Sequence, residues 1–294
     1  MHLDAAKRKA LPFIKMQGIG NDYVYVDGFK NKVDDPVELA RLISHRQFGV
    51  GGDGLVLICP PDEPGQADAR MRIFNADGSE AEMCGNAIRC VGKYVYESGI
   101  AEKSELRVET LAGVRVLGLA VENGVVRLVK VDMGHPGFEC ESIPMVCPSA
   151  DKDFINRGIM AGGKAWKGTA VSMGNPHLVI PVDDVKSLDV PGIGPSFENH
   201  PLFPKRVNTE FVEVKSRDRV AMRVWERGSG ETLACGTGAC ATLVACAVNG
   251  LTDKKAVVEL LGGELLIEWT DEGSVFMTGG AEIVFTGEYF IPNS

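Results

Sequence analysis

Two short stretches of the sequence each place a cysteine directly before a glycine at the start of a predicted helix. After Cys84-Gly85, apolar side chains recur at helical spacing, and after Cys235-Gly236 an uncharged run continues to an Asn-Gly pair. At a helix N-terminus, unpaired backbone N–H groups and the positive end of the helix dipole stabilise a thiolate, and a glycine lets a bound anion approach the backbone. Both thiols are therefore candidates for acid–base chemistry beside an anionic group.

The match between the two stretches extends well beyond the Cys-Gly pair. The matched positions are Asn75 and Glu226, nine residues before each cysteine; Glu80 and Glu231, four before; and Gly99 and Gly250, fifteen after. A segment of turn-forming residues also opens each copy. A repeat in this register indicates two duplicated halves that each provide one cysteine.

The chemistry expected of two such cysteines is inversion of a carbon centre. If the halves face each other, a substrate carboxylate fits between the two helix ends, whose N–H groups favour the charge that develops when the neighbouring carbon loses a proton. One thiolate removes the proton, and the opposite thiol returns one to the other face. A thiol has a reference pKa of about 8.5, so a helix end that shifts this pKa makes both protonation states usable near neutrality. We expect no metal and no organic cofactor.

Length and composition indicate a globular protein of two domains. The chain has 294 residues, of which 45% are hydrophobic and 24% charged. We expect a tail at 1–10, an N-terminal domain at 11–134 plus 277–294 that carries Cys84, and a C-terminal domain at 135–276 that carries Cys235. The net charge of −9 argues against nucleic acid or an anionic membrane as a partner. Because no apolar signal core or membrane-length apolar run is present, we expect a cytoplasmic protein, or a plastid one if the source is a plant or alga.

The other cysteines fit neither a disulfide framework nor a metal site. A chain of this length buries large cores without covalent cross-links, and the cysteine spacings are not Cys-x-x-Cys. The five histidines lie far in sequence from the cysteines at 84, 90, 235, 240 and 246. We therefore expect small buried apolar side chains at Cys59, Cys140, Cys147 and Cys246, and helix packing at Cys90 and Cys240.

Residues 49–54 match the G-x-G-x-x-G pattern of dinucleotide-binding folds, but the order of elements excludes that fold. A predicted helix at 36–47 precedes the glycines and a predicted strand at 55–58 follows them, which is the reverse of what the fingerprint requires. Residues 186–206 are expected to form a Pro-rich connection with one short helix at 196–199. The other strands expected are 13–16, 23–26, 71–74, 106–108, 114–121, 125–131, one around Val146, 164–172, 178–182, 208–214, 220–225, 257–260, 265–269, 275–277 and 283–285.

The chain resembles the diaminopimelate epimerase family from Phe13 to about Phe290. The motifs that carry the resemblance are GIGNDYVYVDG, FGVGGDG, RIFNADGSEAEMCGN, VSMGNPH, NTEFVEV and WERGSGETLACGTGAC. The resemblance implies an α/β (α+β) fold of two pseudo-symmetric domains, each a curled mixed or antiparallel sheet around a central helix, with the last strand returning to the first domain. It also implies a cofactor-independent isomerase that interconverts LL- and meso-diaminopimelate in lysine and cell-wall precursor biosynthesis.

The same resemblance implies roles for individual residues. Cys84 and Cys235 correspond to the catalytic pair. The carboxylate and amine contacts correspond to Gly85, Asn86, Gly236 and Thr237. The residues that grip the substrate correspond to Asn21, Asn75, Asn175, Asn208, Glu226 and Arg227, and His177 corresponds to an active-site neighbour. The sequence departs from the family pattern at Gln17, Gly54 and Ala87-Ile88, beside the motifs, which affects substrate packing rather than the reaction.

Structural and functional alternatives stay open at this point. The turn asparagines are also typical capping residues, and Glu226-Arg227 is also compatible with a surface ion pair of little energetic value. A racemase of another amino acid on the same scaffold would not need Glu226-Arg227. A non-catalytic thiol redox or binding protein would instead need a Cys84–Cys235 disulfide as its working state. A homodimer is one assembly open to the chain.

Overall fold

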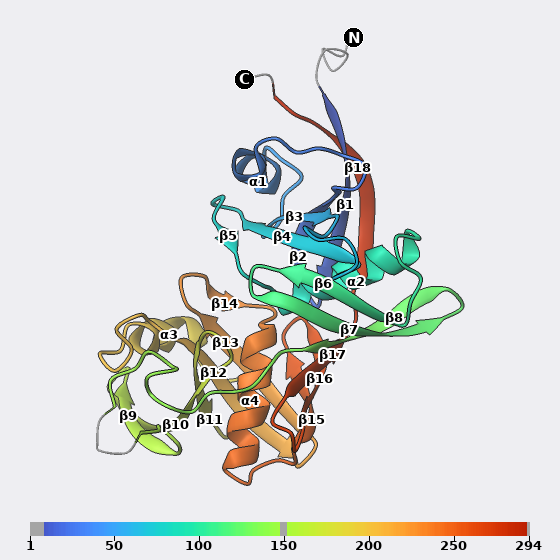
Figure 1. The fold of residues 1–294 in the computed structure, drawn as a ribbon. Coiled ribbons are helices and arrows are strands. Elements are labelled where there is room, and N and C mark those ends of the chain that lie inside the picture. Colours follow the sequence, from blue (N-terminus) through green and yellow to red (C-terminus); the bar gives the residue numbers. More distant parts are fainter. Residues whose placement is uncertain (1–8, 148–151, 293–294) are drawn as a thin grey trace. The chain divides into compact units, whose positions relative to one another are not determined.

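The computed structural model describes residues 9–147 and 152–292, which group into two compact units (Figure 1). Unit 1 comprises residues 1–131 and 280–294, and unit 2 comprises residues 132–279. The chain thus leaves unit 1, forms unit 2 and returns to unit 1 with its last strand. That these units act as the two halves of one catalytic protein stays a prediction. Within the described residues, no helix has both the length and the apolar character that crossing a bilayer requires.

Unit 1 is a curled sheet built around one central helix. Strands β1 (Ala10–Gly18) and β2 (Asn21–Asp27) form a hairpin whose two turn residues, Ile19 and Gly20, both have positive φ, 51° and 90°. The other elements of unit 1 are α1 (Pro36–Ser44), β3 (Gly54–Cys59), β4 (Ala69–Asn75), β5 (Glu80–Ala81), α2 (Gly85–Glu97), β6 (Glu105–Thr110), β7 (Gly113–Glu122), β8 (Val125–Asp132) and β18 (Glu282–Phe290). Strand β3 runs parallel to β2, and β18 pairs antiparallel with β1. The last strand of the chain therefore lies beside the first.

Helix α2 is held against this sheet by its apolar face. Ile88, Val91 and Val95 recur at helical spacing and are completely buried. Each contributes roughly 1.5–3 kcal/mol by burial. Arg89, on the same helix, is also fully buried, and its guanidinium donates to the carbonyl oxygens of Gly85 and Gly280 at 3.1 Å each. The first turn of α2 is thereby fixed to the last segment of unit 1.

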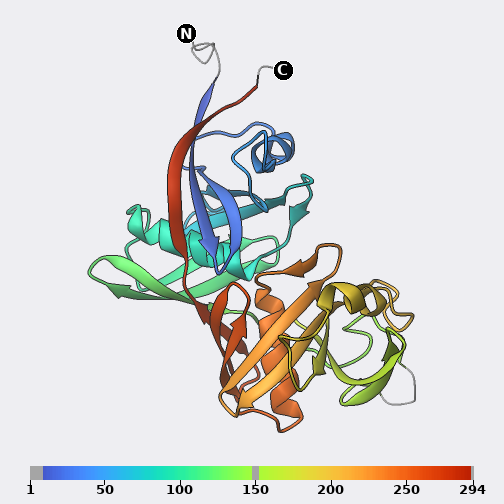
Figure 2. The ribbon, with the colours of Figure 1, turned by 180° about the vertical axis from the view of Figure 1, so that it is seen from behind.

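Unit 2 repeats this plan with a second central helix, α4 (Gly236–Val248). The other elements of unit 2 are β9 (Arg157–Ala161), β10 (Lys164–Ser172), β11 (Pro176–Pro181), α3 (Val190–Glu198), β12 (Asn208–Ser216), β13 (Arg219–Glu226), β14 (Gly230–Thr232), β15 (Lys255–Leu260), β16 (Gly263–Trp269) and β17 (Val275–Gly279). Strands β11 and β12 are parallel, and β12 and β13 are antiparallel. Helix α4 lies against strands on several sides, and every residue from 238 to 246 is buried. The enclosure predicted from its uncharged sequence is confirmed (Figure 2).

Most predicted elements are present. The glycines at 49–54 do not form a dinucleotide-binding motif, since α1 precedes them and β3 follows them. Helix α1 ends at Ser44 rather than 47, because the backbone of His45 is extended, with ψ 119°. The strand predicted around Val146 is wrong. Val146 lies in an irregular segment with 53% of the residue exposed, although its N–H donates to the carbonyl of Leu202 at 2.8 Å. The short strands β5, β9 and β14 were not predicted.

The connection at 186–206 contains a longer helix than predicted. Helix α3 spans Val190–Glu198, and the carboxylate of Asp189 caps it by accepting the N–H of Gly192 at 3.1 Å. Two prolines and two glycines within these nine residues hide the helix from propensity rules. Packing decides the outcome, because Val190 and Phe197 are fully buried in the core of unit 2.

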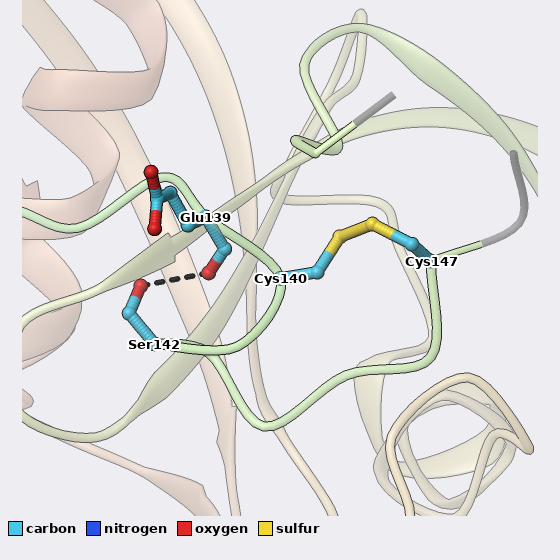
Figure 3. Close-up of a disulfide and its surroundings, with 4 residues drawn as sticks. All are labelled: Glu139, Cys140, Ser142 and Cys147. Atoms are coloured by element: carbon cyan, nitrogen blue, oxygen red, sulfur yellow. Dashed lines mark hydrogen bonds between the residues drawn. A yellow bond between two sulfur atoms is a disulfide. The ribbon is translucent and has the colours of Figure 1, made fainter. Parts of the chain in front are cut away.

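Two cysteines predicted to be separate apolar side chains form a disulfide instead. Cys140 and Cys147 are bonded, with their Cα atoms 5.9 Å apart (Figure 3). The intervening chain folds back on itself. The hydroxyl of Ser142 donates to the carbonyl of Glu139 at 2.7 Å, and the N–H of Met145 donates to the carbonyl of Cys140 at 3.0 Å. The sequence shows no Cys-x-x-Cys signal, so only this local fold reveals the pairing.

The other packing cysteines behave largely as predicted. Cys90, Cys240 and Cys246 are free and buried, whereas Cys59 is free but only half-buried. Cys90 lies within α2 and Cys240 and Cys246 within α4, so all three pack inside the units.

Candidate active site

Cys84 occupies the N-cap position of α2. Its backbone is extended, with φ −138° and ψ 118°, and its thiol is free and half-buried. The first N–H groups of a helix have no partner within the helix, and among the described residues no side chain caps α2. The predicted placement of this cysteine at a helix N-terminus is confirmed. The thiol of Cys84 and the outward-pointing N–H donors of the first turn of α2 therefore lie at the same end of the helix.

Asn21 lies beside this thiol at the start of β2. The Sγ of Cys84 is 3.5 Å from Oδ1 of Asn21, and Nδ2 of Asn21 donates to Oδ2 of Asp53 at 2.8 Å. Arg46 pairs with Oδ1 of Asp53 at 2.9 Å. Burial raises the pKa of Asp53, and the charge of Asp22 raises it further. Asp53 is a site residue that the sequence analysis missed; it orients the amide of Asn21 so that its oxygen faces the thiol.

Two other predicted residues of unit 1 are asparagines with side-chain partners inside this unit. Asn86 is buried in the first turn of α2, where its Oδ1 accepts from Nη1 of Arg89 at 2.9 Å. Its side chain is therefore directed inward, and its backbone N–H belongs to the donor set of the helix end. Asn75 ends β4, and its Nδ2 donates to the hydroxyl of Ser79 at 3.0 Å.

Cys235 occupies the matching N-cap position of α4, also with an extended backbone, φ −129° and ψ 106°. Its thiol is free but buried, with 5% of the residue exposed. Its Sγ accepts the N–H of Gly238 at 3.4 Å and lies 3.7 Å from the hydroxyl of Thr237. The repeat seen in the sequence is therefore a repeat of local structure. Each unit contains a cysteine at the start of its central helix.

A chain of hydrogen bonds leads from Cys235 into the interior of unit 2. Nδ2 of Asn175 donates to the hydroxyl of Thr237 at 3.3 Å, and Oδ1 of Asn175 lies 2.9 Å from Nε2 of His177. Nδ1 of His177 lies 2.7 Å from Oε1 of Glu210. His177 and Glu210 are both fully buried. The structure thus brings the predicted residues Asn175, His177 and Thr237 together with Cys235.

Glu210 was not identified from the sequence, although a signal was present. It is an acidic residue in the apolar segment 208–214 and lies on the same face of β12 as Asn208 and Val212. An unpaired charge is rarely buried on a strand, so an acidic residue at such a position indicates a polar partner.

The remaining predicted residues of unit 2 surround the turn after β13. Asn208 is buried and accepts the N–H of Arg227 at 2.9 Å. Arg227 is exposed, and its Nη1 donates to the carbonyl of Lys205 at 3.2 Å. Glu226 is half-buried and accepts a hydrogen bond from the hydroxyl of Thr232. This turn offers a carboxylate and a guanidinium on adjacent residues.

The environment of Cys235 stabilises its protonated form. Burial raises the pKa of this thiol well above its usual range, and the negative charges of Glu226 and Glu210 add to the effect. Hydrogen bonds from Thr237 and Gly238 oppose it without reversing it. Desolvation of the thiol is therefore a larger influence on this pKa than the N–H donors of the helix end.

The fold of this chain is similar to that of solved structures from a known class of proteins. A Bacillus anthracis protein of the PhzF phenazine-biosynthesis family has a TM-score of 0.71 at 18% identity, covering 96% of this chain and 100% of that one. A hydroxyproline epimerase from Agrobacterium vitis has a TM-score of 0.67 at 16% identity, covering 98% and 94%. The fold is that of the PhzF and proline-racemase-like epimerases.

Sequence relatives narrow the class. The family model named diaminopimelate epimerase matches residues 13–139 and 169–284. Proteins named diaminopimelate epimerase from Desulfovibrio desulfuricans and Acetivibrio thermocellus are 57% and 56% identical to this chain, covering 96% and 94% of it and 99% and 97% of their own lengths. One from Methanococcus maripaludis is 52% identical, covering 95% of this chain and 99% of its own length. The chain belongs to the diaminopimelate epimerase family.

Proposed function

We propose that this chain is an isomerase that interconverts LL- and meso-2,6-diaminopimelate, in lysine and cell-wall precursor biosynthesis, by moving a proton at the α-carbon. The observation that carries the proposal is the free cysteine at the N-cap of the central helix in each of the two units. Relatives more than half identical over almost the whole chain bear the name of this activity. The substrate is a small amino acid, and no cofactor enters the proposal.

The proposed reaction uses one thiolate and one thiol. The substrate α-carboxylate accepts hydrogen bonds from first-turn N–H groups at Gly85, Asn86, Gly236 and Thr237, which favour the charge that develops on it. One sulfur takes the α-proton as the C–H electron pair moves into the carboxylate. The other sulfur delivers its proton to the opposite face, so the two sulfurs exchange protonation states and the carbon is inverted. The facing arrangement of the thiols is part of this proposal.

The burial of Cys235 suggests which sulfur begins in which state. Because burial and two carboxylates raise the pKa of Cys235, this cysteine is the thiol that delivers a proton in the resting enzyme. Cys84, half-buried beside Asn21, is the opposite sulfur of the pair. The reverse reaction uses the exchanged states.

The far end of the substrate requires partners for a second ammonium and carboxylate. Arg227 and Glu226 are adjacent at the turn after β13, and an arginine binds a carboxylate with two parallel hydrogen bonds. In this proposal Asn75, Asn175 and Asn208 supply further amide groups to the substrate. The pair of Glu226 and Arg227 distinguishes a diaminopimelate epimerase from a racemase of a smaller amino acid, because a smaller amino acid has no charged far end to bind.

We also propose a cytoplasmic homodimer. Strand β18 pairs with β1 and lies at the margin of unit 1 (Figure 2). Its residues Ile283, Val284, Phe285 and Phe290 are each at least 41% accessible. A row of exposed apolar side chains on one strand favours contact with a second copy. Light scattering of the purified protein, compared with a Val284→Lys variant, tests this assembly. A monomeric mass for the unaltered protein would contradict it.

Incubation with LL-diaminopimelate in D₂O tests the activity and the two-thiol mechanism together. The expected result is conversion to the meso form with solvent deuterium at the α-carbon, abolished in Cys84→Ser and in Cys235→Ser. Cys59→Ser, which alters a half-buried free thiol, is the matched control and should remain active. Absence of exchange in folded, reduced protein would refute the substrate assignment. Full activity in either catalytic-cysteine variant would refute the mechanism.

A further inference from the structure

The carboxylate of Glu210 is buried within unit 2, and it has no hydrogen bond to a residue that is predicted to bind the substrate. It is fully inaccessible, and its Oε2 has no hydrogen-bond partner among residues 9–147 and 152–292. Its Oε1 lies so close to the first turn of α4 that a β-carbon at Gly238 would be only 2.7 Å away. Burial of a carboxylate is energetically costly unless a partner compensates, and the partner present is His177 at 2.7 Å.

The contacts of His177 define where its protons lie. Both ring nitrogens face oxygen atoms: Nδ1 faces Glu210 Oε1, and Nε2 faces Asn175 Oδ1. The amide of Asn175 is oriented by its other end, because Nδ2 donates to the hydroxyl of Thr237. In this orientation Oδ1 only accepts, so Nε2 must carry a hydrogen. The short bond to Glu210 holds a second proton, either on the ring or on the carboxyl.

We propose that Glu210 is a positioning residue that keeps Nε2 of His177 protonated and so directs a chain of donors toward the sulfur of Cys235. The chain runs from His177 Nε2–H to Asn175 Oδ1, from Asn175 Nδ2–H to the Thr237 oxygen, and from the Thr237 O–H to Sγ. In each of these hydrogen bonds the donor is the group nearer the interior of unit 2, so every group in the chain donates toward Cys235. This inference rests on the proposed role of Cys235 in proton transfer.

The charges around Glu210 show why Cys235 needs such a chain. The titratable groups that act on this site are His177 on β11, Glu226 at the end of β13 and Cys235 at the start of α4. Glu226 and Glu210 both disfavour a thiolate at Cys235, yet Cys235 must hold that negative charge after it has delivered its proton. Outward-directed donors from Thr237 and Gly238 supply the compensation. Without Glu210, the single ring proton of a neutral His177 can lie on Nδ1 instead of Nε2. The direction of donation along the chain can then reverse.

Glu210→Gln tests the proposal because it keeps the shape of the side chain and removes its charge. We expect kcat for diaminopimelate to fall at least about tenfold while KM stays within about twofold, since charge-assisted hydrogen bonds are about twice as strong as neutral ones. Removal of the Glu210 charge by itself favours a thiolate at Cys235, whereas loss of the directed donors disfavours it. Alkylation of Cys235 by iodoacetamide only at higher pH than in the unaltered protein, as followed by peptide mass spectrometry, is therefore the result expected from the lost donors, and alkylation at lower pH would overturn the proposal. Glu213→Gln is the matched control on the same strand, where the carboxylate is on the surface and bonds Lys215 and Val185. A kcat within twofold of the unaltered protein with an unchanged alkylation profile would overturn the proposal.

Nitrogen NMR of the unaltered protein tests the same point without a substitution and without turnover. With the His177 resonances assigned by their loss in His177→Gln, Nε2 should report a bonded hydrogen throughout about pH 6 to about pH 9. An Nε2 without a hydrogen at neutral pH would overturn the proposal, even if Glu210→Gln fails to fold. Because this measurement needs no substrate, it separates failure of the inference from failure of the proposed activity.

Discussion

The side chain of Asn208 connects two segments that the sequence separates widely. Its Oδ1 accepts the backbone N–H of Arg227 at 2.9 Å, and its Nδ2 donates to the carbonyl of Pro176 at 3.0 Å. The residue is only 4% exposed. One amide therefore fixes both the turn that carries Glu226 and Arg227 and the start of β11. The predicted contact of Asn208 with substrate stays a prediction, whereas its structural bonds are observed.

Asn208→Ala should lower both stability and substrate binding. The N–H of Arg227 and the carbonyl of Pro176 would each lose a buried partner, so we expect the free energy of unfolding to fall by about 1–3 kcal/mol. KM should rise because the turn at 226–227 is no longer fixed. Urea unfolding and steady-state kinetics measure the two effects, with Asn199→Ala at an exposed helix end as the control. Unfolding and KM values equal to those of the unaltered protein would contradict the role of this amide.

Arg227→Ala should weaken binding of diaminopimelate without unfolding the protein. The side chain is exposed, and the backbone N–H that Asn208 holds is retained, so the free energy of unfolding should change by less than about 0.5 kcal/mol. Loss of a bidentate carboxylate contact should raise KM at least about tenfold. Arg217→Ala, which removes an exposed partner of Asp253 in the same unit, should leave KM unchanged. Unaltered kinetics in Arg227→Ala would instead favour a racemase of a smaller amino acid.

Stability should fall in mildly alkaline solution because several buried thiols resist ionisation. Burial raises the pKa of Cys90 to about 11 and that of Cys246 to about 12. An unfolded thiol has a pKa of about 8.5. Below about pH 8.5 both states keep the proton, and stability is fully present; from there up to the folded pKa values only the unfolded chain ionises, so stability is lost.

Denaturation at a series of pH values measures this loss. Each buried thiol should contribute about 1.4 kcal/mol per pH unit within the window. Cys246→Ala should reduce the slope by one such contribution, and Cys59→Ala, at a half-buried position, should reduce it less. Equal slopes in the unaltered protein and in Cys246→Ala would show that the thiol at 246 ionises as readily in the folded state as in the unfolded chain.

The disulfide between Cys140 and Cys147 should stabilise unit 2. For a sequence separation of seven, the loop-entropy model gives about 2 kcal/mol. Cys147→Ser should therefore unfold at lower urea concentration than the unaltered protein, and a reducing agent should lower the midpoint of the unaltered protein but not that of the variant. Equal midpoints with and without reductant in both proteins would mean that the bond contributes nothing to stability.

Local signals in the sequence determined the position of both candidate catalytic cysteines. A Cys-Gly pair before a helical pattern and an Asn-Gly or Gly stop after it specify a helix and its start within a few residues, and both cysteines lie at N-caps. The helix α4 could be predicted as enclosed because it contains no charge. These properties depend on neighbours in the chain, which is why sequence reasoning recovered them.

Only the tertiary structure determined the groups that surround those cysteines. Glu210 contacts His177 because β11 and β12 pair in parallel. That pairing joins segments about thirty residues apart in the sequence. The connection between them was predicted to be mostly irregular, but it contains helix α3. The disulfide of Cys140 and the helix α3 likewise depend on packing that overrides local preference. The raised pKa of Cys235 follows from burial, a property of the folded unit as a whole. Local sequence therefore identified the candidate catalytic residues, and folding determined the electrostatic surroundings of these candidates, because desolvation and long-range contacts have no signature in local spacing.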